Sequence, residues 1–503
     1  MRKTMILLLF SFLMAACSQR PVCYYLDATG GDDNNSGLSS DKAWKSLEKL
    51  REVKLQPGNK VLLKRGEVFN GELEISAHGT PENRIYVDAY GEAEPKPCIV
   101  GHENSMYAAR IYNSDYVTLQ NLEIVNTGKQ PVPYRSGLKI ESMNYGVSHH
   151  IVVNNVTVRD VNGSLVKEKG GGCGIYIVNG GKEKVSVFNR LTIENCHILR
   201  CTRNAMIWAA YSDRKDWHPS KHTVIRGNLI EEVPGDGIVP IGCDSTLIEY
   251  NVMRNCPDML PDTEAAAGIW PWSCDNTIIQ FNEVSDHKAP WDAQGFDSDW
   301  NCTGTVIQYN YSHDNYGGLA LVCNDGGADK SFNAGNVGTL VRYNVSIGDG
   351  VRPKTTRAGM FSPGIHLAGP VKNSRITHNI LHVNRKPSSD IDRTMITLDS
   401  WGGYPDSTFV SENIFYAPEG SRINMTESTN NFFDGNYYVG RFEKLPEDSK
   451  ARLTSGTYLK EVVEKDANGY QGLAMLMDTV EVSGAKGVFV NKEAIEKFFH
   501  RLE

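Results

Sequence analysis

The sequence lacks two features that would place it in common functional classes. Beyond its first residues it contains no apolar run of the roughly 20 residues that a bilayer span requires. It also has no basic patch with interleaved aromatic residues, and its formal net charge is −8. Because nucleic-acid binding depends on Lys and Arg side chains that neutralise phosphates, we expect no nucleic-acid partner. The 503 residues are 40% hydrophobic and 22% charged, as in ordinary soluble globular proteins.

The N-terminus has the pattern of an export signal. Arg2 and Lys3 precede an apolar run over 5–14, and small residues then lead to Cys17. The stretch "LMAAC" resembles a bacterial lipobox, in which the cysteine is lipidated; a plain signal cleaved just before that cysteine is the alternative. We expect a lipoprotein signal over 1–17 and a membrane contact only through this lipid anchor. Because no acidic cluster follows the cysteine, the periplasmic face of the outer membrane is the expected location.

One short phrase recurs along most of the chain. It appears as "TLIEYN", "TIIQFN", "TVIQYN" and "TLVRYN", and more loosely elsewhere. The copies are short, β-branched and roughly alternating, as strands are. A solenoid that accepts insertions fits their irregular spacing, and one Asn per coil then stacks on the Asn of the next. This ladder is expected at Asn121, Asn155, Asn195, Asn228, Asn251, Asn282, Asn310, Asn344, Asn379, Asn413 and Asn436.

Each coil carries a second strand-like phrase, often opened by glycine. Examples are "DGIVPIGC", "AGIWPWSC", "GFDSDWNC" and "GGLALVC". Buried thiols behave as small hydrophobic groups. We therefore expect the closing cysteines to form a stack inside the solenoid rather than disulfides; these are Cys243, Cys274, Cys302 and Cys323.

These repeats, with distinct segments at both ends, resemble the pectate-lyase-like right-handed parallel β-helix superfamily. The resemblance implies an all-β solenoid of about ten or eleven coils, with an N-terminal strand and helix cap and the first strands over 18–105. The β-helix is then expected over 106–450, and a small C-terminal cap over 451–503. Members of the superfamily act mostly on carbohydrates that lie along the exposed groove, so a carbohydrate partner is implied. One fold hosts many reactions, however.

The stretch "WDAQGFDSDW" over 291–300 carries the candidate chemistry. Aligning the second phrases on Gly237, Gly268 and Gly295 stacks Asp297 with Trp270 and Asp299 with Trp272, with a one-residue bulge before Cys302. Residues two apart share a strand face, which puts these two Cα atoms about 6–7 Å apart. A carboxylate pair at this spacing fits the acid and base of a glycosidase.

Further side chains are expected around this pair. Glu264 and Asp236 are candidates to assist catalysis. The aromatic and imidazole groups expected to bind substrate are Trp270, Trp272, Trp300, Trp291, His287 and His313. For His313 a hydrogen bond within a turn is the more ordinary interpretation.

Three functions remain open. The first is a glycoside hydrolase with paired carboxylates and no required cofactor, although the polygalacturonase motifs "NTD", "GHG" and "RIK" are absent. The second is a polysaccharide lyase, in which Asp292, Asp297 and Asp299 hold Ca²⁺ through oxygen ligands. Its base would come from Lys288, Lys330, Arg352, Lys354 or Arg357. The third is a non-catalytic glycan-binding solenoid.

Overall fold

The structure is a computed structural model that describes residues 21–328, 333–350, 352, 355, 360–383, 394–454 and 475–502. The predicted signal over 1–17, its Cys17, and the candidate bases Lys330, Lys354 and Arg357 lie outside these residues. Within the described ranges, no helix is both long enough and apolar enough to cross a membrane.

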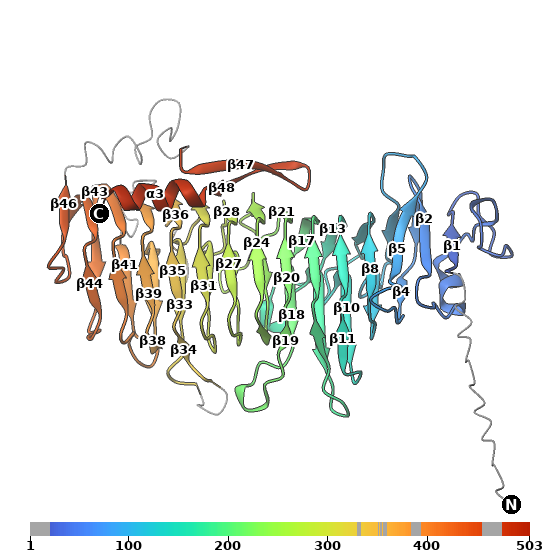
Figure 1. Cartoon of the computed structure of the whole chain (residues 1–503), viewed down its shortest axis with the longest axis horizontal. Coiled ribbons are helices and arrows are strands. Elements are labelled where there is room, and N and C mark those ends of the chain that lie inside the picture. Colours follow the sequence, from blue (N-terminus) through green and yellow to red (C-terminus); the bar gives the residue numbers. More distant parts are fainter. Residues whose placement is uncertain are drawn as a thin grey trace, which may run out of the picture.

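The chain winds into a parallel β-helix, as the repeats predict, and Figure 1 shows the coils stacked along the long axis. Parallel pairs along the first wall join strands one coil apart, for example β24 to β27. This wall, sheet A, has fourteen strands, which are β1 (Cys23–Leu26), β2 (Lys60–Lys64), β5 (Ile85–Tyr90), β8 (Val117–Gln120), β12 (Val152–Asn154), β16 (Thr192–Glu194), β20 (Val224–Arg226), β24 (Leu247–Glu249), β27 (Ile278–Gln280), β31 (Val306–Gln308), β35 (Leu340–Arg342), β39 (Arg375–Thr377), β42 (Phe409–Ser411) and β44 (Phe432–Asp434).

Two further walls complete each coil. Sheet B contains β3 (Val68–Asn70), β6 (Cys98–Val100), β9 (Glu123–Asn126), β13 (Thr157–Asn162), β17 (His197–Thr202), β21 (Leu229–Glu231), β25 (Val252–Arg254), β28 (Glu283–Ser285), β32 (Tyr311–His313), β36 (Val345–Ile347), β40 (Ile380–His382), β43 (Ile414–Asn424), β45 (Tyr437–Phe442) and β46 (Arg452–Thr454). Sheet C contains β4 (Leu73–Ile75), β7 (Ala109–Tyr112), β10 (Ser136–Met143), β14 (Cys173–Gly180), β18 (Asn204–Ala209), β22 (Ile238–Val239), β30 (Phe296–Ser298), β33 (Ala320–Cys323), β37 (Ile365–Ala368) and β41 (Thr394–Asp399).

Short elements occupy the corners and loops. A four-stranded sheet consists of β11 (Val147–His149), β15 (Val187–Asn189), β19 (Ser220–Lys221) and β23 (Cys243–Asp244). The two-stranded sheets pair β26 (Ala265–Ala266) with β29 (Trp291–Asp292), β34 (Asn336–Val337) with β38 (Val371–Lys372), and β47 (Met477–Val482) with β48 (Ala485–Val490). The helical turns are η1 (Ser40–Lys42), η2 (Leu47–Glu52), η3 (Lys167–Lys169) and η4 (Arg214–Asp216), and the one α-helix among the described residues is α3 (Lys492–Leu502).

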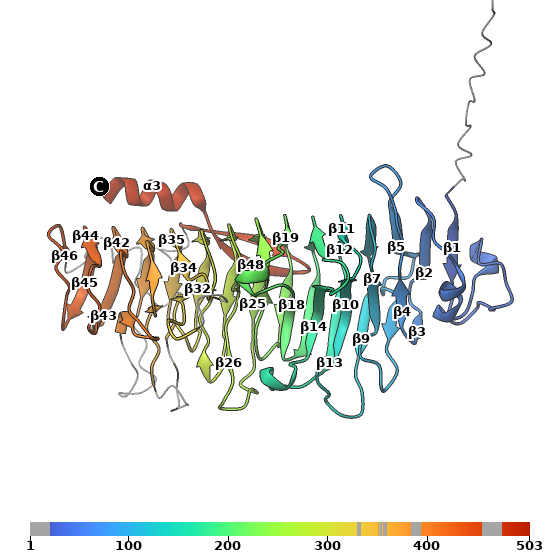
Figure 2. The same ribbon diagram turned by 90° about the horizontal axis from the view of Figure 1, so that it is seen from below.

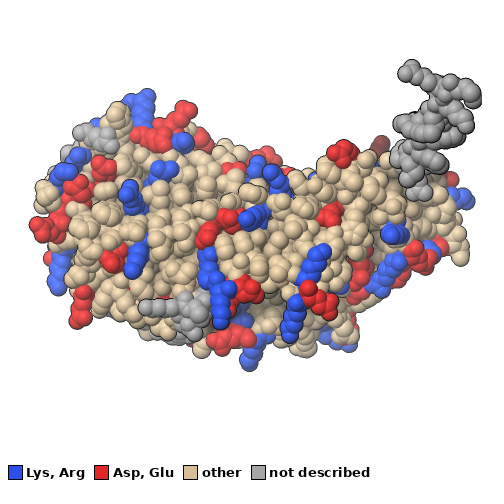
Figure 3. All heavy atoms as spheres, turned by 60° about the horizontal axis from the view of Figure 1, so that its bottom comes forward, with Lys and Arg blue, Asp and Glu red and all other residues tan. Residues whose placement is uncertain are grey.

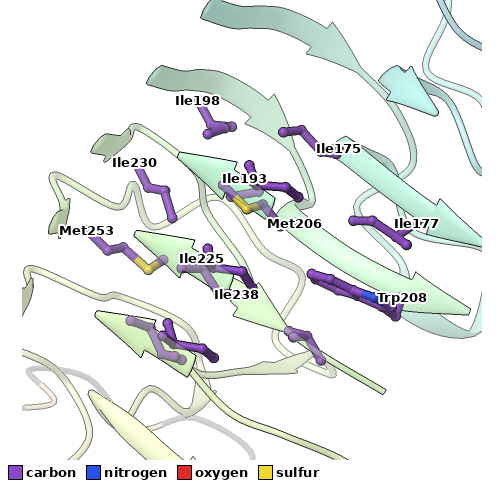
Figure 4. Packing of buried hydrophobic residues seen from close by; sticks show 14 of the residues in the cluster. Ile175, Ile177, Ile193, Ile198, Met206, Trp208, Ile225, Ile230, Ile238 and Met253 are labelled. Atoms are coloured by element: carbon purple, nitrogen blue, oxygen red, sulfur yellow. The ribbon is translucent and has the colours of Figure 1, made fainter. Parts of the chain in front are cut away.

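The core runs along the inside of the solenoid. Figure 4 shows its filling between the walls, where Ile175, Ile193, Ile225 and Met206 converge from different sheets. These side chains are fully buried. Because each strand alternates inward and outward residues, one apolar residue in two suffices to fill this core.

The asparagine ladder starts later than the repeats predict. From Asn228 to Asn413 each buried amide donates Nδ2–H to Oδ1 of the next ladder asparagine at 2.8–3.0 Å, with Asn436 as the last acceptor, which confirms this part of the prediction. Asn121, Asn155 and Asn195 lie outside this buried ladder, although Asn155 Nδ2 donates to Asn121 Oδ1 at 2.7 Å. The pairing of β16 with β20 sets Asn195 opposite Gly227, so Cys196 occupies the ladder position there. These three asparagines instead stand at outward corners with φ of 53–59°.

The stacked coils begin well before residue 106, the predicted boundary. β2 and β5 already pair in register with each other and with β8. With these strands included, sheet A has fourteen strands, more than the ten or eleven coils expected. At the N-terminal end Trp44, Leu47 and Leu50 join the core beside Leu26.

The described part of the predicted C-terminal cap runs along the solenoid. Figures 1 and 2 show α3 and the β47–β48 hairpin lying along its outside. We name residues 475–502 the C-terminal strap. It covers a column of stacked rings, Tyr250, Phe281, Tyr309 and Tyr343, whose centroids are 5.1–5.3 Å apart.

Hydrogen bonds fasten the strap to several coils. The N–H of Val488 donates to Glu283 Oε2 at 2.7 Å, and Ser483 Oγ donates to the carbonyl of Gly227 at 2.9 Å. Tyr437 donates its hydroxyl to the carbonyl of Leu502 at 2.8 Å. The strap therefore joins coils that are far apart in sequence.

The cysteine stack is confirmed for three of its four members. Cys243, Cys274 and Cys302 are free thiols and fully buried, and the N–H of Cys243 lies 3.3 Å from the sulfur of Cys274. Cys323 does not belong to this column. It packs with Leu321 and Ala368 in a separate cluster.

Candidate active site

The predicted glycine register is confirmed. Bridges pair Ile238 with Ile269 and Ile269 with Phe296, so Asp297 follows Trp270 in its column and Asp299 follows Trp272. A later bridge joins Asp275 to Thr303, an offset larger by one residue. The bulge before Cys302 is therefore also present.

The two aspartates lie on the outer face of sheet C, but they are not equally accessible. Phe296 and Ser298 of β30 are fully buried, so the alternate residues Asp297 and Asp299 point away from the core. Asp297 is only 4% exposed, and its Oδ1 has no hydrogen-bond partner among the described residues. Asp299 is half-buried. Of the predicted pair, Asp299 alone is open to a substrate.

The two predicted assisting carboxylates are structural. Arg203, fully buried, forms ion pairs with both Asp236 and Glu264, the latter at 3.1 Å. Asp236 also accepts hydrogen bonds from the N–H of Ala267 and the indole of Trp270, at 3.1 and 3.0 Å. The arginine holds the pKa of Asp236 below its ordinary value against the effect of burial. Both carboxylates thus brace the floor of the site rather than face a substrate.

Trp270 is not an open sugar platform. It is 6% exposed, and Lys167 Nζ lies 4.9 Å from the centroid of its ring. The backbone N–H of Lys167 is in turn held by Glu264 Oε2 at 2.8 Å. The lysine therefore forms part of the wall above the aspartates. Trp272, Trp291 and Trp300 are half-buried.

Asp292 is brought to the same place by a strained turn. Asp292 and Ala293 both have left-handed backbone conformations, with φ of 61° and 65°. Such conformations are costly for residues other than glycine and tend to occur at functional sites. Arg352, 1% exposed, donates to the carbonyls of Ala289 at 2.9 Å and of Asp292 at 3.0 Å, and so holds this turn.

Electrostatics link Asp292 to the predicted pair. Burial and then the charge of Asp299 raise the pKa of Asp292 to about 7, opposed by Lys167. Burial, Asp292 and Asp299 raise the pKa of Asp297 well above its ordinary range. Burial also raises the pKa of Asp299, against hydrogen bonds from Cys323 at 3.1 Å and from the N–H of Trp300 at 2.6 Å. These two donors favour the ionised form of Asp299.

A pocket of about 380 Å³ opens beside Asp292. It is lined by Trp291, Asp292, Gln294, Arg352, Phe361, His366, Asp399 and Trp401. Aromatic side chains with a few polar groups are typical of a ligand pocket. Trp291 was predicted to bind substrate, and the structure places it here.

Five lining residues were missed, namely Gln294, Phe361, His366, Asp399 and Trp401. One signal was available for His366, since the phrase "GIHLA" repeats the glycine-led pattern of "GFDSD". The register Asp297–Leu321–His366 confirms that these positions share one column. His366 Nε2 lies 3.4 Å from Asp399 Oδ2, and Trp401 meets the His366 ring edge-on at 5.7 Å.

Neither predicted histidine is placed to bind substrate. His287 is fully buried, with Nε2 2.9 Å from the carbonyl of Gly235, and burial lowers its pKa to about 4. His313 lies on β32 of sheet B, beside Glu283 and Asp314. These carboxylates raise the pKa of His313 to about 9 against the effect of burial. His313 thus has a structural role, but through Glu283 on the neighbouring strand as well as Asp314 rather than through a turn alone.

Two features bear on the lyase hypothesis. No group of three or more His, Cys, Asp or Glu in the described ranges has the arrangement of a metal site, so Asp292, Asp297 and Asp299 are not assigned as Ca²⁺ ligands. Arg352, a candidate base, donates hydrogen bonds from Nη1 and Nη2 to backbone carbonyls. On the face in Figure 3, Lys and Arg are interspersed with Asp and Glu, without a broad area of one sign.

Comparisons with known proteins agree with the β-helix fold. The model of the right-handed β-helix region matches residues 186–385. The chain is 26% identical to a lacto-N-biosidase from Bifidobacterium longum subsp. longum, over 85% of this chain. The alignment covers 31% of that relative, so the chain spans about a third of its length.

Solved structures of other proteins are also similar to this chain. The crystal structure of a GH136 lacto-N-biosidase from Eubacterium ramulus matches with a TM-score of 0.61 and 26% identity, covering 78% of this chain and 67% of the other. A PL6-family alginate lyase matches with a TM-score of 0.50 and 13% identity, covering 84% of this chain and 54% of the other. At that identity the lyase supports the fold alone.

Proposed function

Because the chain is a right-handed parallel β-helix protein, similar over most of its length to lacto-N-biosidases, we propose that it is a glycoside hydrolase. The observation that carries this proposal is the pairing of Asp292 with Asp299 next to an aromatic pocket. Glycosidases need two carboxyl groups in different protonation states, one on each side of the scissile bond. Here burial and Asp299 raise the pKa of Asp292 to about 7, while two hydrogen bonds favour the ionised form of Asp299.

In the proposed reaction Asp292 is the general acid. Its pKa of about 7 keeps it largely protonated in mildly acidic solution, so that it can protonate the departing glycosidic oxygen. Asp299, with two hydrogen bonds to Oδ1, is the ionised partner that stabilises the positive charge developing on the sugar. Asp297, part of the pair expected from the sequence, is too deeply buried to contact the glycosidic bond and stays neutral behind Asp299.

The pocket is suited to bind a compact end of a glycan substrate. Trp291, Phe361 and Trp401 offer apolar faces of the kind that sugar rings contact. His366, Asp399 and Gln294 offer hydrogen-bonding groups for hydroxyls. By its similarity to the two lacto-N-biosidases, a lacto-N-bioside is the first substrate to test, and no cofactor is required by this chemistry.

The test is hydrolysis of a chromogenic lacto-N-bioside and of a panel of glycans by the purified protein. Asp292→Asn and Asp299→Asn should each reduce kcat by roughly 10²–10⁴-fold, the range of general acid–base catalysis. Asp262→Asn, at an exposed aspartate, is the matched control and should keep full activity. Unsaturated uronate products, detected by ultraviolet absorbance, would point to a lyase instead. Glycan binding without turnover would select the non-catalytic alternative.

The pH dependence gives a second test of the roles. The ratio kcat/KM should fall above about pH 7, where Asp292 loses the proton that it must donate. It should also fall in acid, where Asp299 takes up a proton. In Asp292→Asn the remaining activity should lose its alkaline decline; an alkaline decline that persists with the same midpoint would contradict this assignment.

We also propose that the protein is an exported lipoprotein on the periplasmic face of the outer membrane, joined to it through Cys17. The support is the signal pattern over 1–17 alone. Metabolic labelling with a fatty acid should mark the wild type and not Cys17→Ala. Equal labelling of both proteins, or labelling of neither, would contradict the proposal.

A further inference from the structure

One thiol of the described chain contacts the proposed ionised carboxylate. Cys323 Sγ donates to Asp299 Oδ1 at 3.1 Å, across the pairing of β30 with β33. The thiols of the interior column behave differently, since Cys274 and Cys302 contact backbone carbonyls of Trp272 and Pro271, at 3.2 and 3.4 Å. Cys323 thus stands on the outer face of sheet C, on the side of the aspartates.

The surroundings hold this thiol in place. Cys323 is 1% exposed and packs with Leu321 and Ala368, with Trp300 and Trp401 against the same cluster. Its sulfur and the N–H of Trp300 both bind Oδ1 of Asp299. Among the described residues no hydrogen bond reaches Oδ2, which is left for a substrate.

From this geometry we propose that Cys323 is a positioning residue, which orients the Asp299 carboxylate and keeps it ionised by donating a hydrogen bond to Oδ1. The inference rests on the proposed function. A donor to one oxygen stabilises the charged carboxylate and fixes its plane. Burial, by contrast, makes the thiol a poor nucleophile, because it raises the pKa of Cys323 well above its ordinary value.

Other charged and titratable groups face Asp299 and also influence its pKa. Asp292 on β29 and Asp297 on β30 repel the charge of Asp299 whenever they are ionised, and Asp236 repels it as well. Lys167 attracts it, and Cys302 lies within range on the inner side. Cys323 also faces Asp297 and Asp292, so the hydrogen bond is isolated by comparing Cys323→Ala with Cys323→Ser, which keeps a donor.

The experiment compares the pH profiles of kcat/KM for the wild type, Cys323→Ala and Cys323→Ser. Loss of the donor in Cys323→Ala should move the acid limb upward by about 0.5–1 pH unit and lower kcat more than it changes KM. The hydroxyl of Cys323→Ser is still a donor, so this variant should shift less. Cys243→Ala, a buried thiol of the interior column, is the control for packing and should leave the acid limb unchanged.

Two outcomes would overturn the inference. One is an acid limb in Cys323→Ala that coincides with the wild type, and the other is an equal shift in the alanine and serine variants. Asp299→Asn separates this test from the proposed function. If that variant stays fully active, the proposed catalytic pair is wrong; if it is inactive while Cys323→Ala is normal, only the role of Cys323 is wrong.

Discussion

At the scale of single residues, the site depends on carboxyl groups that are kept out of water. The sequence indicates which residues stack, because the glycine register correctly sets Asp297 and Asp299 behind Trp270 and Trp272. It does not indicate which are accessible, because that depends on loops folded over the strand. Asp292 looks like an ordinary turn aspartate until the left-handed turn and Arg352 bring it to Asp299.

A buried carboxyl with a raised pKa has a cost in stability that grows with pH. Asp297 is neutral in the folded chain at pH values where it is ionised in the unfolded chain, so the unfolded state binds fewer protons and stability falls as pH rises. Asp297→Asn should therefore stabilise the protein at pH 7, by about 1–2 kcal/mol. Chemical denaturation at pH 7 and at pH values near 4 would measure this gain.

The gain should shrink towards acid, since aspartate becomes protonated in both states below about pH 4. The exposed Asp262→Asn provides the baseline at each pH. A destabilised Asp297→Asn protein at pH 7, or a gain that does not change with pH, would show that Asp297 is not held neutral.

At the scale of the coil, the asparagine ladder is the element that the sequence reveals best. Eight stacked amides from Asn228 onward follow the repeated phrase. The three earlier asparagines fit the same phrase but lie one residue before the ladder position. A six-residue pattern does not distinguish an inward residue from the corner residue that precedes it. Only strand pairing resolves the difference, as for Asn195 and Gly227.

Removing one rung of the ladder should be costly. In Asn310→Ala the N–H and Nδ2 of Asn282 both lose their acceptor, in a place that water does not reach. Buried unpaired donors cost about 1–3 kcal/mol each, so we expect a loss of about 2–5 kcal/mol in the free energy of unfolding. Asn195→Gly, at the exposed corner where the positive φ suits glycine, should cost less than about 1 kcal/mol. Similar losses in the two variants, measured by denaturant unfolding, would contradict this account.

At the scale of the whole molecule, the C-terminal strap changes the character of the solenoid. Coils of a solenoid ordinarily contact only their neighbours. Here Phe489 packs with Leu229 and Val252 and meets the ring of Tyr250 edge-on. The sequence predicts a helix in this segment, but the surface on which the helix packs is the aromatic column. In the sequence the residues of that column look like ordinary strand residues.

Weakening the strap should affect stability and leave catalysis intact. The strap lies on the side of sheet B, and the proposed pair lies on the outer face of sheet C. Phe489→Ala should cost about 3–5 kcal/mol, as expected for a buried Phe. Deleting 475–503 should bare the aromatic column and cause aggregation on warming.

Thermal unfolding with light scattering, and activity at low temperature, are the measurements. The control is Lys497→Ala, on the exposed side of α3. Lost activity in a folded Phe489→Ala protein would show that the strap also supports the site.

The strap also implies an order of folding events during synthesis of the protein. It is synthesised after the coils that it contacts, because its partners lie about two hundred positions earlier, such as Glu283 for Val488 and Arg254 for Lys486. Coils that need only their neighbours can wind as the chain emerges, starting from the N-terminal end. A nascent chain therefore passes through a stage at which most of the β-helix has formed while its column of stacked aromatic side chains is still exposed to solvent.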